Sequence, residues 1–323
     1  MMRIGFIGAG KVGYTLGRYF TEQGSFLFDR TFLSNKKALR ACTSASTRQE
    51  SCASQESGLR NVQKHTFLYV TGYCSHTMRS AEDAAEFTGS KSYSQMEQLV
   101  ADSDVVFFTV PDEAIAEVWE QVKTFPIQGK IICHCSGALS SAVFSEIGQM
   151  GASGYSIHPF FAVSDRYNSY KELSKALFTI EGTNDRLEEM TGLLRQCGLT
   201  VQQIQAAGKV RYHAAAAVAS NLVVGIVELA EELLVSCGFS QENALYALKP
   251  LMEGNLSRIM EAGTAEALTG PLERADSGTV QKHLQALEGE DREIYRLLSQ
   301  KILGVAKSKN PNRDYMEMER ILQ

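Results

Sequence analysis

The sequence predicts an α/β protein in which an N-terminal parallel sheet precedes an all-helical C-terminal domain. Short apolar runs rich in Val, Ile and Phe alternate with helical segments as far as about residue 204, which is typical of buried parallel strands and their connecting helices. A glycine-rich turn joins the first of these runs to the first helix. From Lys209 onward the pattern is helical throughout, with breaks expected at Gly238, Pro250, Gly263 and Gly270–Pro271.

Length and composition are those of two ordinary globular domains. The chain has 323 residues, of which 44% are hydrophobic and 21% are charged. Its 32 Lys and Arg residues against 37 Asp and Glu residues give a net charge of −5, which argues against a nucleic-acid partner. Seven cysteines, an odd number, do not suggest a disulfide framework, so we expect free thiols and a cytoplasmic location.

No segment of the sequence has the pattern of a signal peptide or of a membrane span. The most apolar stretch, residues 214–234, contains Ser220, Asn221 and three glutamates, whose burial in hydrocarbon would be costly. We therefore expect this stretch to be a buried helix of a soluble protein and expect no membrane partner.

The first strand, Arg3–Ile7, runs directly into Gly8-Ala9-Gly10-Lys11-Val12-Gly13 and then into a helix. In this pattern the first glycine permits a tight turn, the second lets the backbone approach a pyrophosphate, and the third lets helix and strand pack closely. The free N–H groups at the helix start would hold the pyrophosphate. A glycine-rich turn of some other α/β protein is the alternative, but the strand before the motif and the helix after it favour a Rossmann-type dinucleotide site.

Two segments compete for the second strand, and the choice sets the cofactor. In the first, residues 26–29, Asp29 would bind a ribose 2′-hydroxyl, which indicates NAD. In the second, residues 66–73, the strand end is followed by Ser75, His76 and Arg79, which suit a 2′-phosphate and hence NADP. Residues 30–65 hold seven Lys or Arg against two acids and show no sustained period, as expected of a surface insertion (26–65 overall). This favours the second segment and NADP, with NAD still possible.

The next strands end in small and polar residues. Residues 105–110 form an apolar strand that Pro111 should end, which places Val110 and Pro111 at the carboxyl edge where a nicotinamide would pass. Asp112 has two open interpretations, as part of that site or as a helix cap. Helices are expected at 80–88, 94–101 and 114–118.

The strand at 130–135 should place Ser136 and Gly137 in the same crevice. Cys133 and Cys135 share one face of this strand and His134 the other, so we predict buried structural residues and no metal site. A further strand, 154–161, is expected to break at His158–Pro159, where His158 is either structural or part of the substrate site.

The domain boundary is predicted at 160/161, with residues 1–160 as the nucleotide-binding domain and 161–323 as linker strands (176–182 and 200–204) and a helical domain. At 100° per residue, Lys209, His213, Ser220 and Val224 share one helix face, with Asn221 beside it. A Lys and a His one turn apart on an apolar helix indicate either a site or a satisfied polar pair.

A second group of polar residues lies in the loop 267–279. Arg274 is placed to bind a carboxylate, Thr269 is a candidate substrate contact, and Asp276 is a credible N-cap for the following helix.

Taken together, these motifs resemble a known family. The glycine loop, residues 109–112, 135–138 and 158–160, KVRYHAAAAVASN (209–221) and ALTGPLERAD (267–276) resemble bacterial Rossmann-like candidate NADP-dependent oxidoreductases with an uncharacterised all-helical C-terminal domain. That family is similar to pyrroline-5-carboxylate reductase and, more distantly, to ketopantoate reductase and the 6-phosphogluconate dehydrogenase-like superfamily. The resemblance covers nearly the whole chain outside residues 26–65.

The resemblance implies an interdomain cleft for the nicotinamide and a helical domain that forms a homodimer. It implies pyrophosphate binding by residues 8–13 and 2′-phosphate binding near Ser75, His76 and Arg79. A helix Lys and Asn of superfamily relatives match Lys209 and Asn221. The chain departs from the family in its insertion and in Ala275, where the family has Gly.

The resulting hypothesis is an NADP-dependent oxidoreductase that moves a hydride between nicotinamide and a small carbonyl or imine acid. Lys209 or His213 would donate the proton, and Asn221 and Ser136 would hydrogen-bond the substrate or the carboxamide. The alternative is a non-catalytic protein that binds NADP and senses redox state.

Overall fold

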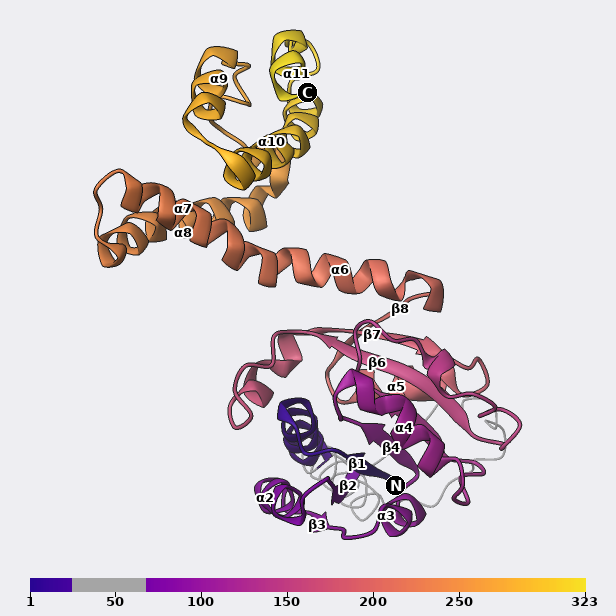
Figure 1. Ribbon diagram of the computed structural model, residues 1–323. Coiled ribbons are helices and arrows are strands. Elements are labelled where there is room, and N and C mark those ends of the chain that lie inside the picture. The colour runs from indigo at the N-terminus through magenta and orange to yellow at the C-terminus, as the bar shows by residue number, and fades with distance from the viewer. Residues whose placement is uncertain (25–67) are drawn as a thin grey trace, which may run out of the picture. The chain divides into compact units, whose positions relative to one another are not determined.

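The computed structural model describes residues 1–24 and 68–323, and the eight strands in these residues form one sheet (Figure 1). Their order is β3-β2-β1-β4-β5-β6-β7-β8. The strands are β1 (Met2–Ile7), β2 (Leu68–Cys74), β3 (Lys91–Ser92), β4 (Val105–Phe108), β5 (Ile131–His134), β6 (Ser153–Phe160), β7 (Leu177–Gly182) and β8 (Thr200–Gln203). The candidate strand with Asp29 lies outside the described residues, and the competing segment is confirmed as the parallel neighbour of β1.

The order from β3 to β6 is that of a Rossmann sheet, with the chain reversing direction across the sheet between β1 and β4. All pairs from β3 to β6 are parallel, whereas β6 and β7 are antiparallel. The predicted fold class is therefore confirmed. The short β3 was not predicted from the sequence.

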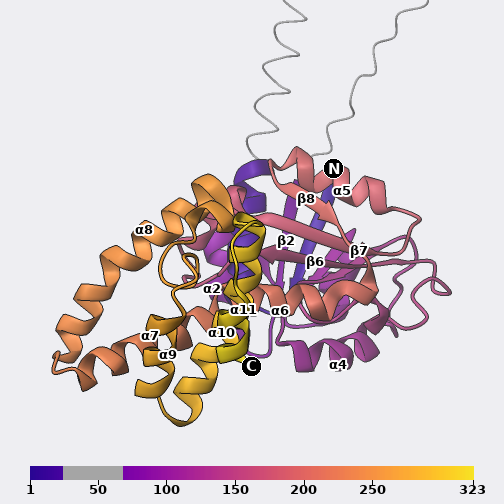
Figure 2. The same cartoon turned by 90° about the horizontal axis from the view of Figure 1, so that it is seen from above.

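Helices cover both faces of this sheet, and in Figure 2 helices α4 (Asp112–Val122) and α5 (Leu187–Gln196) lie on opposite sides of the strands. Each face has its own hydrophobic core, and the neighbouring residues Phe107 and Phe108 of β4 belong to different ones. Besides these, the sheet region contains residues 11–24 in helical conformation, α2 (Met78–Thr88) and α3 (Met96–Asp102). Because successive side chains of a strand point to opposite faces of the sheet, each buried strand contributes to both hydrophobic cores.

Two strand predictions need correction. Strand β4 ends at Phe108, two residues before the predicted end, because Thr109 turns onto the glycine loop and its hydroxyl donates to the Gly8 carbonyl (2.8 Å). Strand β6 does not break at His158–Pro159. Its partner β5 pairs only with residues 153–156, and Pro159 pairs with Phe178 of β7, so the missing proline N–H falls where no ladder bond is needed.

By contacts the chain divides into two compact units, Met1–Ala216 and Ala217–Gln323. The predicted boundary at 160/161 falls inside the sheet, because β7 and β8 continue it. Helix α6 (Lys209–Ala219) begins in the first unit, and its first turn packs there.

The second unit consists of α7 (Asn221–Ser236), α8 (Gln241–Ala267), α9 (Ser277–Ala286), α10 (Gly289–Lys309) and α11 (Met316–Leu322). Its core is small and joins α9, α10 and α11 through residues such as Val280 and Ala306. The prediction of a buried helix over 214–234 is wrong, since none of the residues of α7, all of them described, is buried. Among the described residues no helix has the length and apolarity needed to cross a bilayer.

The predicted break at Pro250 is also wrong, because this residue lies inside α8. Pro250 has no N–H to donate to the carbonyl of Tyr246 four residues before it, and both residues are exposed, so water can satisfy that carbonyl. Gly263, in contrast, interrupts α8 with φ of 82°, as expected.

Candidate functional site

The glycine loop joins β1 to the helix that starts at residue 11, at the point where the strand order reverses. Gly8 has φ of +103°, and a Cβ there would lie 2.7 Å from the carbonyl oxygen of Thr109. A Cβ on Gly13 would lie 2.7 Å from the Thr109 hydroxyl. The chain's own packing therefore requires both glycines.

Gly10 differs from its two neighbours. The nearest heavy atom of the described chain to a Cβ on Gly10 lies at 3.4 Å, which is an ordinary contact, and Gly10 and Lys11 are exposed. Internal packing thus does not demand a glycine at this position. A glycine here leaves the backbone open to close approach by a ligand, and the amides of the first helical turn have no acceptor within the helix.

The carboxyl end of β2 lies against this loop, because the Gly8 amide donates to the Cys74 carbonyl (2.8 Å). Ser75 is half-buried, while His76 and Arg79 are exposed. Thr77 caps α2 by accepting from the Ser80 amide (3.3 Å). The structure therefore places the predicted 2′-phosphate residues beside the glycine loop.

The next strand ends bring Asp112 and Ser136 together. The Ser136 hydroxyl donates to the Asp112 carboxylate (2.6 Å) and accepts from the amides of Ala138 (3.1 Å) and Leu139 (2.9 Å). The hydroxyl of Ser136 is thus used within the protein. Asp112 is the first residue of α4, after the N-cap Pro111, and makes no capping bond, so the interpretation of Asp112 as a helix cap is wrong.

Lys209 is buried, with 1% of its surface exposed. Its ammonium group donates to the Ser136 carbonyl and to the Ser156 hydroxyl, both at 2.8 Å. Burial lowers the pKa of Lys209 to about 8, against the opposing effect of the carboxylates of Glu181 and Asp112. The ammonium ties the first turn of α6 to the turn after β5 and to the middle of β6.

Two imidazoles converge over Gly137. A Cβ on Gly137 would lie 2.6 Å from Nδ1 of His213 and 2.9 Å from Nε2 of His158. The other ring nitrogen of His158, Nδ1, lies 2.8 Å from the hydroxyl of Tyr212. Burial, followed by the charge of Lys209, lowers the pKa of His158 to about 4, so its ring is neutral at pH 7.

Tyr212 was not predicted as a site residue. The sequence does contain a signal, since Tyr212 lies three residues after Lys209 and beside His213 on the same helix. What the sequence lacks is the position of His158, which reaches Tyr212 only because β6 continues past β5.

The buried residues of β5 have the predicted facing. Cys133 and Cys135 pack in one core, while the ring of His134 lies 5.4 Å from that of Phe144 in the other. Burial lowers the pKa of His134 to about 4. Within residues 1–24 and 68–323 no three His, Cys, Asp or Glu side chains form a group that fits a metal ion, and Cys74, Cys133, Cys135, Cys197 and Cys237 are free.

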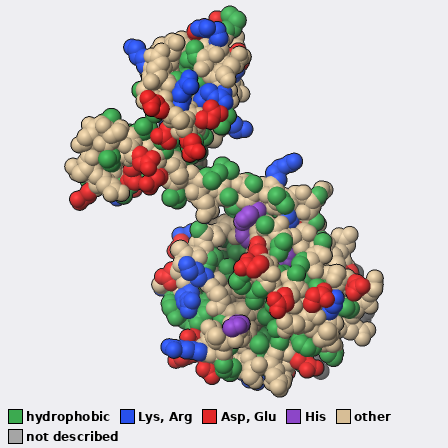
Figure 3. All heavy atoms as spheres, in the orientation of Figure 1, with side chains coloured by type: hydrophobic (Ala, Val, Ile, Leu, Met, Phe, Trp, Pro, Cys, Tyr) green, Lys and Arg blue, Asp and Glu red, His purple; other side chains and the backbone are tan. Residues whose placement is uncertain are grey.

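On the face of the first unit drawn in Figure 3, histidine side chains lie among hydrophobic and acidic ones. Burial among apolar groups favours the neutral form of a histidine, whereas a nearby carboxylate favours its charged form.

The remaining predicted residues belong to the second unit. Asn221 begins α7, and its side-chain oxygen accepts from the Ser220 hydroxyl (3.0 Å). Thr269 lines a cavity of about 580 Å³ together with residues of α8 that include Asn255 and Arg258. Arg274 is exposed, and Asp276 is confirmed as the N-cap of α9, accepting from the Thr279 amide (3.0 Å).

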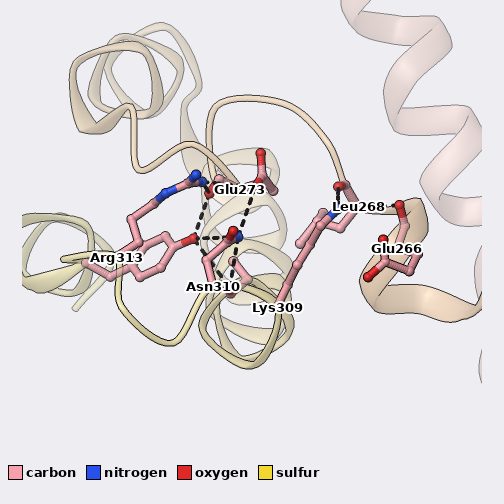
Figure 4. A network of polar contacts seen from close by, with 8 residues as sticks. Glu266, Leu268, Glu273, Lys309, Asn310 and Arg313 are labelled. Carbon is pink, nitrogen blue, oxygen red and sulfur yellow. Dashed lines mark hydrogen bonds and ion pairs between the residues drawn. The ribbon is translucent and has the colours of Figure 1, made fainter.

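A network of polar contacts fixes the loop that carries Arg274 (Figure 4). The carboxylate of Glu273 accepts from Asn310 and Arg313, both at 2.9 Å, and its carbonyl accepts from the Tyr315 hydroxyl (2.6 Å). Ala275 adopts φ of 59°, a left-handed conformation that glycine adopts more easily. This is the position at which the resembled family has Gly.

Two family descriptions match the chain. Residues 57–159 match a Rossmann-like domain, and residues 176–302 match a domain of unknown function, DUF2520. The predicted combination of a Rossmann-like domain with an uncharacterised helical domain is confirmed. No curated protein sequence matches the chain.

Solved structures share the fold over nearly the whole chain. A Thermotoga maritima protein is 23% identical, with 95% of this chain and 99% of its own covered and a TM-score of 0.67. A candidate NADP oxidoreductase from Bacteroides fragilis is 17% identical, with 94% and 98% covered and a TM-score of 0.60. The 1-pyrroline-5-carboxylate reductase of Streptococcus pyogenes is 13% identical, with 95% and 98% covered and a TM-score of 0.55. At these identities the likeness establishes the fold.

Proposed function

We propose that the protein is an NADP-dependent oxidoreductase that transfers a hydride between nicotinamide and a small carbonyl or imine acid. The observation that carries the proposal is Gly10. It is the one glycine of the G-x-G-x-x-G loop whose Cβ the described chain would accommodate, so a ligand is the reason for it. The names of the structural relatives from Bacteroides fragilis and Streptococcus pyogenes support the same class of activity.

The choice of NADP rests on the end of β2. Ser75, His76 and Arg79 supply hydroxyl, imidazole and guanidinium donors there, which suit a doubly charged 2′-phosphate. No acid stands among these residues to bind a free 2′-hydroxyl. The cofactor would supply the hydride, and the residues of this chain would bind the cofactor, orient the substrate and protonate it.

Lys209 acts in this proposal as a positioning residue. Two of the three N–H groups of its ammonium donate to Ser136 and Ser156, and the side chain is closed to solvent, so we assign it to holding these two residues in place. By holding the Ser136 carbonyl it fixes the Ser136–Gly137 turn beneath His158 and His213. His213, which is exposed, stays in the substrate site.

In the second unit, Arg274 is the group proposed to hold a carboxylate. Its guanidinium is exposed on a loop whose backbone the network around Glu273 fixes, which lowers the entropy lost on binding. Asn221 and Thr269 remain proposed substrate contacts of this unit.

We also propose a homodimer that works in the cytoplasm. In α8 only Ala244 and Ala267, of 27 described residues, are buried, while Leu251 and Met260 are 72% and 75% exposed. Apolar side chains in such number are typical of a surface that a second copy covers. The free thiols suit a reducing compartment.

The burial of Lys209, the residue first expected to donate a proton, favours one alternative, a protein that binds NADP and reports redox state without turnover. Oxidation of NADPH, followed at 340 nm against a panel of keto and imino acids, separates the two functions. Turnover of any member supports the oxidoreductase. Binding of NADPH without oxidation across the panel contradicts it and leaves the sensor.

A further inference from the structure

We propose that His158 donates the proton to the substrate and that Tyr212 is the relay residue that resupplies it. This inference rests on the proposed oxidoreductase function and assigns the acid within that site. It differs from a donor role for Lys209 or His213, and it makes Tyr212, which was not predicted as a site residue, necessary for turnover.

The first argument is the position of the His158 ring between the Tyr212 hydroxyl and Gly137. Its Nδ1 lies 2.8 Å from the Tyr212 hydroxyl, and its Nε2 faces Gly137, 2.9 Å from the place of a Cβ. The ring therefore connects a hydroxyl on α6 with the backbone of the turn after β5. A Cβ at residue 137 would collide with both imidazoles, so the close approach of the two rings to this turn requires a glycine.

The second argument is the direction of the hydrogen bond. A phenol is a better donor than acceptor, and an unprotonated imidazole nitrogen is a strong acceptor, so Tyr212 donates to Nδ1. The ammonium of Lys209 lies 5.6 Å from the centre of the Tyr212 ring, and burial raises the pKa of Tyr212, so its hydroxyl keeps the proton that it donates. The proton of the neutral imidazole is then on Nε2, which is the nitrogen over Gly137.

The third argument concerns the charge of His158. The groups that face it are Lys209, Tyr212 and His213 from α6, Asp112 from α4 and His134 from β5. Burial and the cationic groups outweigh the carboxylate and keep the pKa near 4. At neutral pH the ring is thus uncharged and carries a single proton, the one on Nε2.

The proposed step balances as follows. A bound nicotinamide would supply the hydride with its electron pair by breaking its C4–H bond; the new C–H bond would form at the carbonyl carbon as the C=O π bond breaks and its electrons pass to oxygen. That oxygen takes the Nε2 proton of His158, and Nδ1 takes the hydroxyl proton of Tyr212. Tyr212, which is half-buried, is reprotonated from water, so one hydride and one solvent proton reduce the carbonyl to an alcohol.

The state of the pair is measured without a substrate, by ¹⁵N-histidine NMR of the full chain between pH 5 and 8. The chain has six histidines, and His158→Gln identifies the signals of interest. We expect the neutral form with the proton on Nε2 throughout, and we expect Tyr212→Phe to mix the two tautomers. A proton on Nδ1, or titration near pH 6.5, would overturn the proposal.

Its catalytic part is measured with a keto acid from the panel that the protein reduces. His158→Gln and Tyr212→Phe should each lower kcat by roughly 10²–10⁴-fold with the Kd for NADPH unchanged. Tyr212→Phe should also reduce the solvent deuterium isotope effect on kcat, which a loss of packing alone would leave as it is. Tyr167→Phe, a change in an exposed ring of the first unit, is the matched control.

The outcomes separate the two proposals. Turnover that survives both His158→Gln and Tyr212→Phe removes the acid assignment and leaves the oxidoreductase. A panel without any turnover removes the oxidoreductase and the acid role together, while the NMR experiment still decides the tautomer of His158.

Discussion

The two units of the chain bury very different shares of their residues. In the first unit every residue of β4 and β5 is buried, and even the polar groups Lys209 and Ser156 are closed off and bonded to each other. In the second unit the 27-residue α8 buries two alanines, all its residues being described. The difference teaches that the first unit holds a preorganised polar site, whereas the second exposes apolar surface, which we propose that a second copy covers.

The largest effect is expected from breaking the apolar surface of the second unit. The double change Leu251→Arg and Met260→Arg should convert a dimer of twice 35.5 kDa into a monomer, measured by sedimentation. Each fully buried side chain of this kind contributes about 1.5–3 kcal/mol, and a buried arginine adds a desolvation cost. Leu177→Arg, at a 40% exposed position of β7, is the control that should leave the dimer intact. A wild-type chain that sediments as a monomer at tens of micromolar would contradict the proposed dimer.

The next largest effect concerns the closed polar site of the first unit. Because the folded pKa of Lys209 is about 8 against 10.5 for the ordinary side chain, the unfolded chain binds the proton more tightly. The wild type should therefore gain stability relative to Lys209→Met as the pH rises from 8 to 10.5. One pKa unit corresponds to about 1.4 kcal/mol, so the gain is on the order of a few kcal/mol. Urea denaturation of both proteins across that pH range measures the free energy of unfolding. If it changed with pH equally in both proteins, folding would not lower the pKa of Lys209.

A smaller effect is expected at the exposed end of β2. Arg79→Ala should weaken NADPH binding by roughly 10–100-fold, the range of a charge-assisted hydrogen bond of about 1.5–3 kcal/mol, and should leave NADH binding nearly unchanged. Fluorescence titration with both nucleotides tests this. Equal losses for the two would mean that Arg79 does not contact the 2′-phosphate.

The smallest effect is expected at Ala275, where the second unit holds an alanine at φ of 59°. Ala275→Gly should raise the free energy of unfolding by about 0.5–1 kcal/mol, because glycine avoids the clash of Cβ in the left-handed region. Thermal denaturation measures the gain. A loss of stability would show that the network around Glu273 forces the conformation by itself.

Features that depend on local chemistry were predictable from the sequence. The strand before Gly8, the glycine loop and the cap at Asp276 each follow from a few neighbouring residues. The opposite facing of Cys133 and His134 follows from the period of a strand.

Features that depend on tertiary pairing were not predictable. Pro159 stays in a strand because β5 is shorter than β6, and Pro250 stays in a helix because its surroundings are exposed. Lys209 bonds to Ser156, which lies 53 residues away in the sequence, and Tyr212 bonds to His158, which lies 54 residues away. No local pattern records such distances, so the sequence of the helix alone pointed to Lys209 or His213 as the proton donor.

The central claim, that the loop at residues 8–13 binds a dinucleotide, is tested most directly by titrating NADPH into Gly10→Ala. The described chain leaves a Cβ at Gly10 its nearest contact at 3.4 Å, so the variant should fold with unchanged stability and lose at least tenfold in affinity. Gly148→Ala, where no described atom lies within 4 Å of the new Cβ, should bind like the wild type. Unchanged NADPH affinity in a folded Gly10→Ala protein would contradict the account.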